Sequence, residues 1–383
     1  MVTGRNENLT GRIRLGMVGG GNDAFIGGVH RIASRIDDQF ELIAGALSST
    51  PEKSRASGEA LGLQRIYDDF KQMASREARR KDGIEAVSIV TPNHVHYQAA
   101  REFLKRGIHV ICDKPLTSTL ADAKKMVKAV ESSDALFILT HNYTGYPMVR
   151  QAREMVAAGD IGRIRVVQVE YPQDWLTIEQ NFKQAEWRTD PARSGAGGST
   201  GDIGTHAYNL ACFITGLEAE ELAADLEAFV PGRQVDDNAH VMLRFKGGAK
   251  GMLWSSQVAP GNENALRIRV YGEIGGLEWE QEDPNYLWFT PFGEPKRLIT
   301  RGGAGAGDAA ARMSRIPPGH PEGYLEGFAN IYSEAAKAIL AKRTGESVSA
   351  DVMYPTVADG LKGVRFVDAC VRSSQRNAAW VKL

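Results

Sequence analysis

Three side chains in this sequence have the types and settings needed to move a proton to or from an alcohol. Lys114 follows the apolar run HVIC and Asp113 and precedes a proline, and Asp202 and His206 lie four residues apart in GGSTGDIGTHAYNLACFITG. Residues four apart share a face of a helix, and an imidazole can accept a hydroxyl proton near neutral pH. Asp202 would then orient substrate or stabilise the imidazolium. A capping aspartate and a buried structural histidine are an equally good explanation of this pair alone.

A glycine cluster follows the first apolar run. LGMVGGGNDAFIGGVH, Leu15 to His30, is close to the G-x-G-x-x-G fingerprint of dinucleotide-binding turns, but five residues rather than two separate Gly21 from Gly27. We expect Gly19 and Gly21 to allow a tight turn close to a pyrophosphate, and a helix starting near Gly27 to supply free N–H groups. The insert NDAFI is predicted to form a longer loop over the pyrophosphate. The alternative is an ordinary glycine-rich turn.

The end of the second predicted strand bears on the choice of cofactor. An acid there usually binds the ribose 2′-hydroxyl of NAD, whereas this sequence has Ser48 and Ser49, followed by Lys53 and Arg55. Hydroxyls accommodate either ribose, and a cation could meet a 2′-phosphate. We therefore expect NAD or NADP, with a slight preference for NADP.

Two further polar segments follow predicted strands. VTPNHVH (90–96) follows AVSIV, and CDKPL (112–116) includes the end of HVIC. An open parallel sheet binds its ligands at the carboxyl ends of its strands. Asn93 or Asp113 taken alone is also consistent with a helix cap or a turn.

The elements that must position these residues alternate along the first third of the chain. Apolar runs of strand length are separated by amphipathic helical stretches, which is the pattern of a doubly wound parallel sheet. The predicted strands are 13–18, 41–47, 86–90, 109–112 and 136–140, and the predicted helices include 54–62, 97–107 and 121–133. Gly107 is placed to end its helix in the left-handed conformation.

The regular alternation of strands and helices ends at about residue 140. A helix over 147–162 leads to a strand over 163–171 and then to a polar loop. Further strands are predicted over 221–230, 240–245, 250–258, 266–272 and 275–280, and a late helix over 324–340. The fold class is therefore α/β: an N-terminal Rossmann doubly wound parallel sheet and a C-terminal α+β domain with a large, mostly antiparallel open sheet. The predicted division is a tail over 1–11, a dinucleotide-binding domain over 12–141 and a substrate-binding and oligomerisation domain over 142–383.

Composition excludes several classes of partner. The formal net charge is −1, from 46 basic and 47 acidic residues, which disfavours nucleic acid and anionic membranes. No apolar run reaches the roughly 18 residues of a membrane span, and the first residues lack the apolar core of a signal peptide. Three widely spaced cysteines suit reduced thiols and show no metal-binding spacing. We expect a cytoplasmic protein without a metal site.

Four motifs occur in a fixed order: Gly27 to His30, Thr91 to His96, Asp113-Lys114-Pro115, and Asp202 to His206. Together they resemble the glucose–fructose oxidoreductase / inositol dehydrogenase (Gfo/Idh/MocA) family over most of the chain. The resemblance implies NAD(P)-dependent hydride transfer involving a secondary alcohol of a sugar, glycoside or cyclitol. It implies that Lys114 lies beside the nicotinamide and the reacting hydroxyl, that Asp202 holds substrate and that His206 is the general base.

The predicted ligand contacts extend these motifs. The cofactor-binding residues are Gly19, Gly21, Asn22, Phe25, Ile26, Ser48, Ser49, Lys53, Thr91, Pro92, Asn93, His96, Asp113 and Lys114. The substrate-binding residues are Asn142, Tyr143, Trp175, Trp187, Arg188, Asp202 and His206, which offer aromatic faces and polar groups to a polyol; packing in the core is the alternative for each aromatic. Two departures from the family stand out: Asp113 replaces its usual glutamate, and the fingerprint insert contains Phe25.

The resemblance also implies a homodimer or homotetramer built through the C-terminal sheet. Two other functions remain open at this point. The same fold could act as a reductase or a cofactor-recycling, glycoside-processing enzyme. It could also bind NAD(P) and a sugar as a sensor without turnover.

Overall fold

The computed structural model describes residues 11–22, 24–180 and 188–383, and the chain forms two compact units. The first contains the residues through Thr117, 121–142 and 324–361, and the second contains 118–120, 143–323 and 362–383. The predicted boundary near residue 142 coincides with one of these transitions. The prediction differs at 324–361, which it placed in the second domain and which packs in the first unit.

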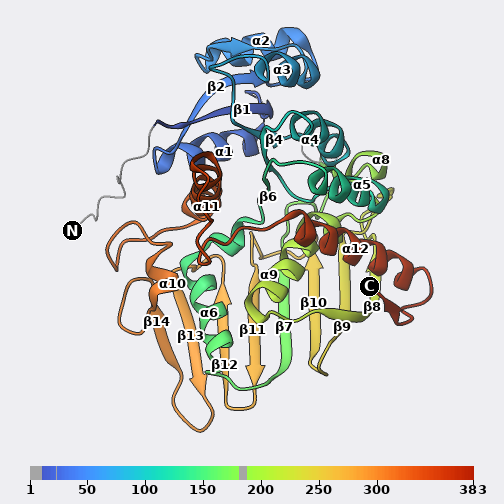
Figure 1. The fold of residues 1–383 in the computed structure, drawn as a ribbon. Helices are drawn as coiled ribbons and strands as arrows, with labels where there is room; N and C mark the ends of the chain where they lie inside the picture. Colours follow the sequence, from blue (N-terminus) through green and yellow to red (C-terminus); the bar gives the residue numbers. More distant parts are fainter. Residues whose placement is uncertain (1–10, 23, 181–187) are drawn as a thin grey trace. The chain divides into compact units, whose positions relative to one another are not determined.

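The first unit is built on a parallel sheet (Figure 1). Its six strands are β1 (Ile13–Gly19), β2 (Phe40–Ala46), β3 (Arg65–Ile66), β4 (Ala86–Val90), β5 (His109–Cys112) and β6 (Phe137–Leu139). Their order is β3-β2-β1-β4-β5-β6, and every neighbouring pair is parallel. This is the strand order of a Rossmann fold, so the predicted fold of this unit is confirmed. The two-residue strand β3 was not predicted, because it is too short to show a period.

Helices cover this sheet. They are α1 (Phe25–Ile36), α2 (Pro51–Ala60), α3 (Phe70–Glu77), the 3-10 turn η1 (Asn93–Val95), α4 (His96–Leu104), α5 (Leu120–Glu131) and α11 (Tyr324–Thr344). The late helix α11 packs beside α1, and its Phe328, Ile331 and Tyr332 enter the same core as Leu15 and Ile111. This burial explains why α11 belongs to the first unit, because its apolar residues need the face of that sheet. Gly107 has φ +72°, as predicted for the residue that ends a helix.

The start of helix α1 corrects the sequence prediction. We predicted a loop through NDAFI and a helix from about Gly27, but α1 begins at Phe25 after the extended residue Ala24. Ile26 packs against the core residues Met17, Leu47 and Val90, which draws the end of the insert into the first helical turn. The described part of the loop is therefore only Asn22 and Ala24.

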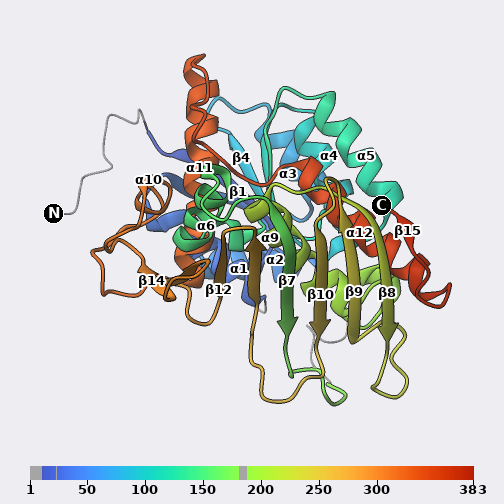
Figure 2. The same cartoon turned by 90° about the horizontal axis from the view of Figure 1, so that it is seen from below.

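The second unit is built on a nine-stranded mixed sheet (Figure 2). Its strands are β7 (Ile164–Pro172), β8 (Ala219–Glu227), β9 (Asn238–Phe245), β10 (Lys250–Ser256), β11 (Arg267–Gly272), β12 (Gly275–Glu280), β13 (Tyr286–Pro291), β14 (Arg297–Thr300) and β15 (Val381–Lys382). The order is β14-β13-β12-β11-β7-β10-β9-β8-β15, in which β7 and β10 pair in parallel and the other pairs are antiparallel. The predicted mostly antiparallel sheet is thus confirmed.

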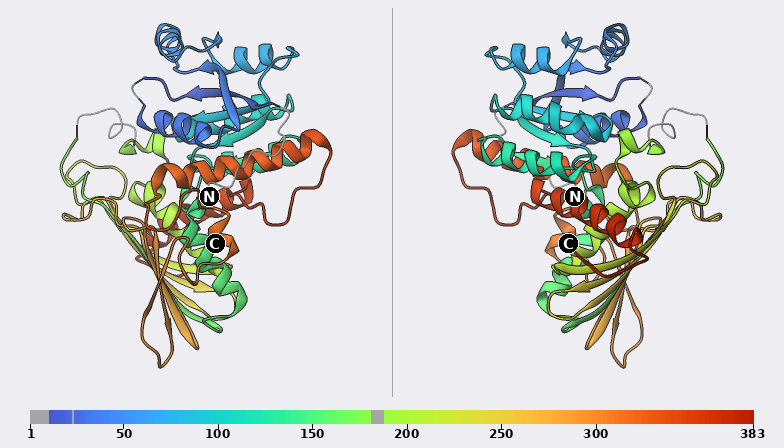
Figure 3. Two further views of the ribbon diagram at one scale, coloured as in Figure 1. Left: turned by 90° about the vertical axis from the view of Figure 1, so that its left-hand side faces the viewer. Right: turned by 90° about the vertical axis from the view of Figure 1, so that its right-hand side faces the viewer.

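One face of this sheet is covered by helices and the other is not (Figure 3). The described helical segments that lie wholly or mostly in the unit are η2 (Asn142–Gly145), α6 (Pro147–Ala158), α8 (Pro191–Ser194), the π turn η3 (Thr200–Gly204), α9 (Thr205–Thr215), α10 (Asp308–Ala311) and α12 (Val357–Ser374), of which η2 and α12 begin with residues of the first unit. Along β9, Val241 and Leu243 are buried while His240 and Met242 are exposed, as expected for strands with one covered face. No helix within the described ranges has the length and apolarity to cross a membrane.

Candidate active site

Three glycines shape the turn between β1 and α1. Gly19 has φ +77°, and a Cβ there would lie 2.7 Å from the carbonyl oxygen of Val90. A Cβ on Gly27 would lie 2.4 Å from the Cα of Gly20. Gly20 and Gly27 therefore form the close strand–helix packing of a dinucleotide fingerprint. The five-residue spacing keeps this contact because the extra residues lie in the turn and in the first helical residues.

Polar groups follow β4 at the same end of the sheet. Asn93 is buried within η1, and Thr91 and Pro92 are half-buried before it. The hydroxyl of Thr91 is a buried atom with no hydrogen-bond partner in the part of the chain that the structure describes. A buried polar atom costs free energy unless a ligand or water satisfies it, so a polar ligand fits this edge.

His96 connects two of the predicted motifs. Its Nδ1 lies 2.9 Å from the carbonyl oxygen of Pro115, and its Nε2 lies 2.8 Å from that of Thr91. The ring is fully buried, and burial lowers the pKa of His96. The histidine therefore braces the loop after β4 against the loop after β5, with both ring nitrogens facing backbone carbonyls.

The segment after β2 presents hydroxyls and cations. Ser48 is half-buried and its Oγ accepts from the N–H of Thr50, while Ser49 and Lys53 are exposed. Arg55 donates to Asp68 at 3.1 Å and to Glu52 at 3.4 Å. Lys53 and Arg55 were the two cations that suggested NADP, and Arg55 is thus engaged by two carboxylates. Close by, Asn22 donates its backbone N–H to Ser57, and Phe25, at the start of α1, is 65% exposed.

Asp113 follows β5 and is held from several sides. Its Oδ1 accepts from the backbone N–H of Lys114 at 2.9 Å and from the hydroxyl of Thr140 at 3.0 Å. Nε2 of His30 lies 3.7 Å from the same oxygen. Burial alone would raise the pKa of Asp113, but the neighbouring His30, together with Lys114 and His96, lowers this pKa to about 2. The carboxylate is therefore ionised at neutral pH. The Lys114–Pro115 peptide bond that follows is cis.

In the second unit, Asp202 lies in the π turn η3 and His206 in the first turn of α9. Buried Asp236 anchors this turn: it accepts from the backbone N–H groups of Gly198 at 2.7 Å and Thr200 at 2.8 Å, and from two hydroxyls. Burial raises the pKa of Asp236 in spite of these bonds. Such π turns are frequent at functional sites, and this one was predicted as a regular helix.

His206 is nine-tenths buried against two tyrosines. Its ring centroid lies 4.8 Å from that of Tyr143 and 6.3 Å from that of Tyr171, both edge to face. The two hydroxyls are 2.5 Å apart, and Tyr171 donates to Asn264 at 2.8 Å, so Tyr143 donates to Tyr171. Burial raises the pKa of Tyr143 to about 12, and this phenol stays protonated near neutral pH.

Asp202 is oriented by two donors. Nε of Arg188 lies 3.1 Å and Nε2 of Gln257 lies 3.0 Å from its Oδ2. The Arg188 guanidinium lies 5.9 Å from the ring centre of Trp175, whose indole N–H donates to Gln173. The structure therefore gathers Tyr143, Trp175, Arg188, Asp202 and His206 in one polar array of the second unit. Trp187, the other predicted wall residue, lies outside the described residues.

Some residues of this array had no signal in the sequence. Tyr171, Gln173, Gln257 and Asn264 come from the ends of β7 and β10 and from the segment before β11, and single polar residues at strand ends are common. Strand pairing brings them together, because β7 lies between β10 and β11. Asn142 precedes Tyr143 but belongs to the first unit, where its Nδ2 is buried with no partner among the described residues.

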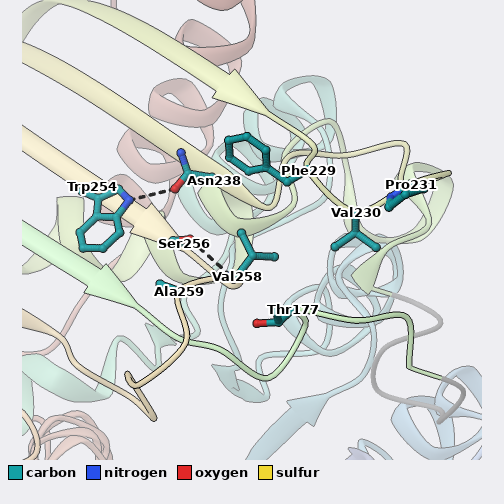
Figure 4. A pocket seen from close by; sticks show the side chains of 9 residues that line it. All are labelled: Thr177, Phe229, Val230, Pro231, Asn238, Trp254, Ser256, Val258 and Ala259. Carbon is teal, nitrogen blue, oxygen red and sulfur yellow. Dashed lines mark hydrogen bonds between the residues drawn. The ribbon is translucent and has the colours of Figure 1, made fainter.

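A cavity of about 440 Å³ lies elsewhere in the second unit (Figure 4). It is lined by Thr177, Phe229, Val230, Pro231, Asn238, Trp254, Ser256, Val258 and Ala259. Trp254 donates its indole N–H to Asn238 at 2.9 Å and stacks on His240, on the helix-free face of the sheet. Because α9 lies on the opposite face, this cavity is separate from the array around Asp202.

Comparison with known proteins identifies the class. Residues 13–141 match the oxidoreductase family with an NAD-binding Rossmann fold, and residues 149–278 match the GFO/IDH/MocA C-terminal domain. The chain therefore belongs to the GFO/IDH/MocA oxidoreductase family. This confirms the family prediction and the predicted enzyme class, an oxidoreductase with an NAD-binding Rossmann fold.

Solved relatives cover nearly the whole chain. An oxidoreductase from Sinorhizobium meliloti is 70% identical, with a TM-score of 0.91 over 97% of this chain and 100% of that one. An inositol dehydrogenase homolog from Azotobacter vinelandii, complexed with NADH and myo-inositol, is 36% identical, with a TM-score of 0.92 over 98% of both chains. Levoglucosan dehydrogenase of Pseudarthrobacter phenanthrenivorans is 27% identical over 96% of this chain and 97% of its own.

Proposed function

We propose that this chain is a cytoplasmic dehydrogenase that oxidises a secondary alcohol of a cyclitol, sugar or glycoside with NAD as cofactor. The observation that carries the proposal is the array of Asp202, His206 and Gln257 beside two tyrosines, which offers a proton acceptor and several hydrogen-bonding groups to a polyol. The relatives that act on myo-inositol and levoglucosan favour the same substrate class.

The residues of the first unit fit a dinucleotide. The glycine turn leaves no room for a Cβ at Gly19 or Gly27, and the helix that follows would offer its N-terminal N–H groups to a pyrophosphate. The hydroxyl of Thr91 and the carboxylate of Asp113 would line the nicotinamide half, and Ser48 and Ser49 the adenosine ribose. His96 would act by bracing the two loops that carry these groups.

We propose separate tasks for the three catalytic residues. The imidazole of His206 accepts the substrate hydroxyl proton, Asp202 holds a neighbouring hydroxyl, and the ammonium of Lys114 polarises the reacting oxygen. The bound nicotinamide supplies the two-electron acceptor for the alcohol carbon. Tyr143, protonated at neutral pH, would pack against the imidazole and keep its ring plane fixed.

We infer NAD rather than NADP as the preferred cofactor. The slight sequence preference for NADP rested on Lys53 and Arg55, and the Arg55 guanidinium is engaged by Asp68 and Glu52. Relatives solved with NAD+ or NADH favour the same choice. A preference for NADP in kcat/KM would overturn this inference and would assign Lys53 to the 2′-phosphate.

The test is turnover of a panel of cyclitols, sugars and glycosides with each cofactor, followed by the absorbance of reduced nicotinamide. We expect activity with at least one polyol, and losses of about 100-fold or more in kcat for Lys114→Ala and His206→Ala, the size usual for a lost acid–base group. Lys81→Ala and His320→Ala, at exposed positions, are the matched controls and should keep full activity.

Three outcomes would contradict the proposal. Full turnover in Lys114→Ala and His206→Ala would remove both residues from the mechanism. Binding of NAD and a polyol without turnover would favour a sensor. Product formation without net reduction of the cofactor would favour a cofactor-recycling reaction.

We also propose that two or more copies assemble through the helix-free face of the nine-stranded sheet. Met242 and Met252 are half exposed and lie opposite each other on β9 and β10, and Val166, Tyr271 and Trp288 are also more than a third exposed. A stable interface buries roughly 800 Å² of each partner with an apolar centre. The exposed apolar side chains of this face supply such a centre.

A further inference from the structure

A buried polar network connects Asp113 to the late helix α11. His30 of α1 lies with Nε2 3.7 Å from Asp113 Oδ1 and with Nδ1 2.9 Å from the hydroxyl of Tyr332. Ser88 of β4 completes a triangle: its Oγ lies 3.2 Å from His30 Nδ1 and 2.9 Å from the Tyr332 hydroxyl. His30, Ser88 and Tyr332 are each at most 1% exposed. The fingerprint histidine is thus joined to a tyrosine about 300 residues later.

The chemistry of these groups indicates which of them donate hydrogen bonds and which accept them. A carboxylate only accepts hydrogen bonds, so the His30 tautomer with its proton on Nε2 turns an N–H toward Asp113 Oδ1, which lies 3.7 Å away and is approached without a direct hydrogen bond. Nδ1 is then an acceptor, and only a hydroxyl group of Tyr332 or Ser88 can donate to it. Replacing the Tyr332 hydroxyl by hydrogen removes one of two donors and keeps the ring.

The packing around His30 leaves it little freedom to move. Its ring meets Phe328 edge to face at 5.1 Å and Tyr332 at 5.8 Å, and Tyr332 meets Phe40 at 5.4 Å. Phe328 and Tyr332 both belong to α11 and lie one helical turn apart. Helix α11 therefore restricts the position of the His30 imidazole, which lies beside Asp113.

Asp113 in turn contacts the backbone of the next residue, Lys114. The same oxygen that faces His30 accepts the backbone N–H of Lys114, and Thr140 of the loop after β6 holds it from another side. We propose that His30, Ser88 and Tyr332 are positioning residues, which place the Asp113 carboxylate and through it the Lys114 backbone at the reacting end of the cofactor. The proposal rests on the proposed role of Lys114.

The decisive variants keep the shape of the core and change one polar contact. Tyr332→Phe should lower kcat about tenfold, the effect of a lost buried hydrogen-bond partner, while the KM for the polyol stays within about twofold because the substrate array lies on other elements. Tyr354→Phe, which removes a hydroxyl from another tyrosine packed on the same core, is the control and should leave kcat unchanged.

Rescue separates a polar role from a packing role. His30→Gln can still donate an amide N–H toward Asp113, whereas His30→Leu fills the space without a donor. We expect His30→Gln to retain more kcat than His30→Leu at a similar midpoint of thermal unfolding. Equal loss in both variants, or loss that follows the unfolding midpoint, would show that the network only stabilises the fold and would overturn the proposal.

A chemical readout on the protein alone distinguishes this proposal from the proposed function. The rate at which an amine-reactive ester acylates Lys114, followed by mass spectrometry of its peptide, should change at least about twofold in Tyr332→Phe, with the rate at exposed Lys81 as internal standard. An unchanged Lys114 rate would contradict the positioning role even if the enzyme is active. A changed rate in a protein that turns over no polyol would contradict only the proposed function.

Discussion

Asp202 carries the carboxylate that would hold a hydroxyl group of the polyol. Arg188 and Gln257 both donate to its Oδ2. A carboxylate held by two donors is fixed in orientation, and preorganised groups of this kind hold a substrate more productively than mobile ones. Gln257 is 2% exposed and follows β10, so its position is determined by the sheet.

Removing one of these donors should loosen Asp202 without removing its charge. We expect Gln257→Leu, which is close in size, to lower kcat/KM by about 10- to 100-fold, since a hydrogen bond to a charged group contributes roughly 1.5–3 kcal/mol. Steady-state kinetics with the best polyol of the panel would measure it. Gln64→Leu, at an exposed position of the first unit, is the control, and an unchanged kcat/KM for Gln257→Leu would show that Arg188 alone orients the carboxylate.

The turn between β1 and α1 has an unusually long spacing between its fingerprint glycines. The close contact between Gly20 and Gly27 is kept at the longer spacing, because the strand and the helix bring these two backbones together. The extra residues are absorbed by an earlier helix start. For this turn, the number of residues between the glycines therefore matters less than the close approach of the Gly20 and Gly27 backbones.

Two neighbouring glycines of α1 give a sharp test of this contact. A Cβ at Gly27 would meet the Gly20 backbone at 2.4 Å, whereas a Cβ at Gly28 would meet, among the described residues and outside its own helix backbone, only an Arg31 nitrogen at 3.9 Å. Gly27→Ala should therefore destabilise the fold and weaken NAD binding at least about tenfold by displacing the turn. Gly28→Ala should bind NAD normally and gain up to about 1 kcal/mol from helix propensity.

Calorimetric titration with NAD and urea unfolding would measure both effects. The comparison is internal, because both variants add one methyl group to the same helix. Equal NAD affinities in the two variants would mean that the turn tolerates displacement and that the close approach is not required for binding.

At the scale of the whole molecule, the open face of the nine-stranded sheet is the feature that needs a partner. Its strands alternate buried and exposed residues although no described helix covers the exposed side. Ion pairs such as Arg267 and Arg269 with Glu170 lie among the apolar residues of this face. A mixture of apolar and charged groups is usual for interfaces between copies of one chain.

Charge placed on this face should separate the copies. We expect the wild-type chain to be a dimer or tetramer by light scattering after gel filtration, and Met242→Glu with Met252→Glu to lower its mass toward that of one chain, because a buried unpaired carboxylate is costly. Ile36→Glu, at a partly exposed position on α1, should leave the mass unchanged. A monomeric wild type would contradict the proposed assembly.

Much of the fold and of the candidate site has local signals in the sequence, for a physical reason. Buried parallel strands such as Ala86–Val90 are short apolar runs, and glycines near their ends are local signals, so both are visible in a window of a few residues. The four-residue spacing of Asp202 and His206 is also a local signal. Even the family could be inferred, because its four motifs are each contiguous.

Only the tertiary structure decided the remaining features. Tyr332 lies about 300 residues from His30, and Gln257 lies 55 residues from Asp202, so neither contact has a local pattern. The late helix α11 was predicted as a helix but assigned to the wrong unit, because amphipathicity reveals that a helix has an apolar face and not which core receives it. Such contacts arise when distant elements bury apolar surface together, and they are determined by the packing of the whole unit.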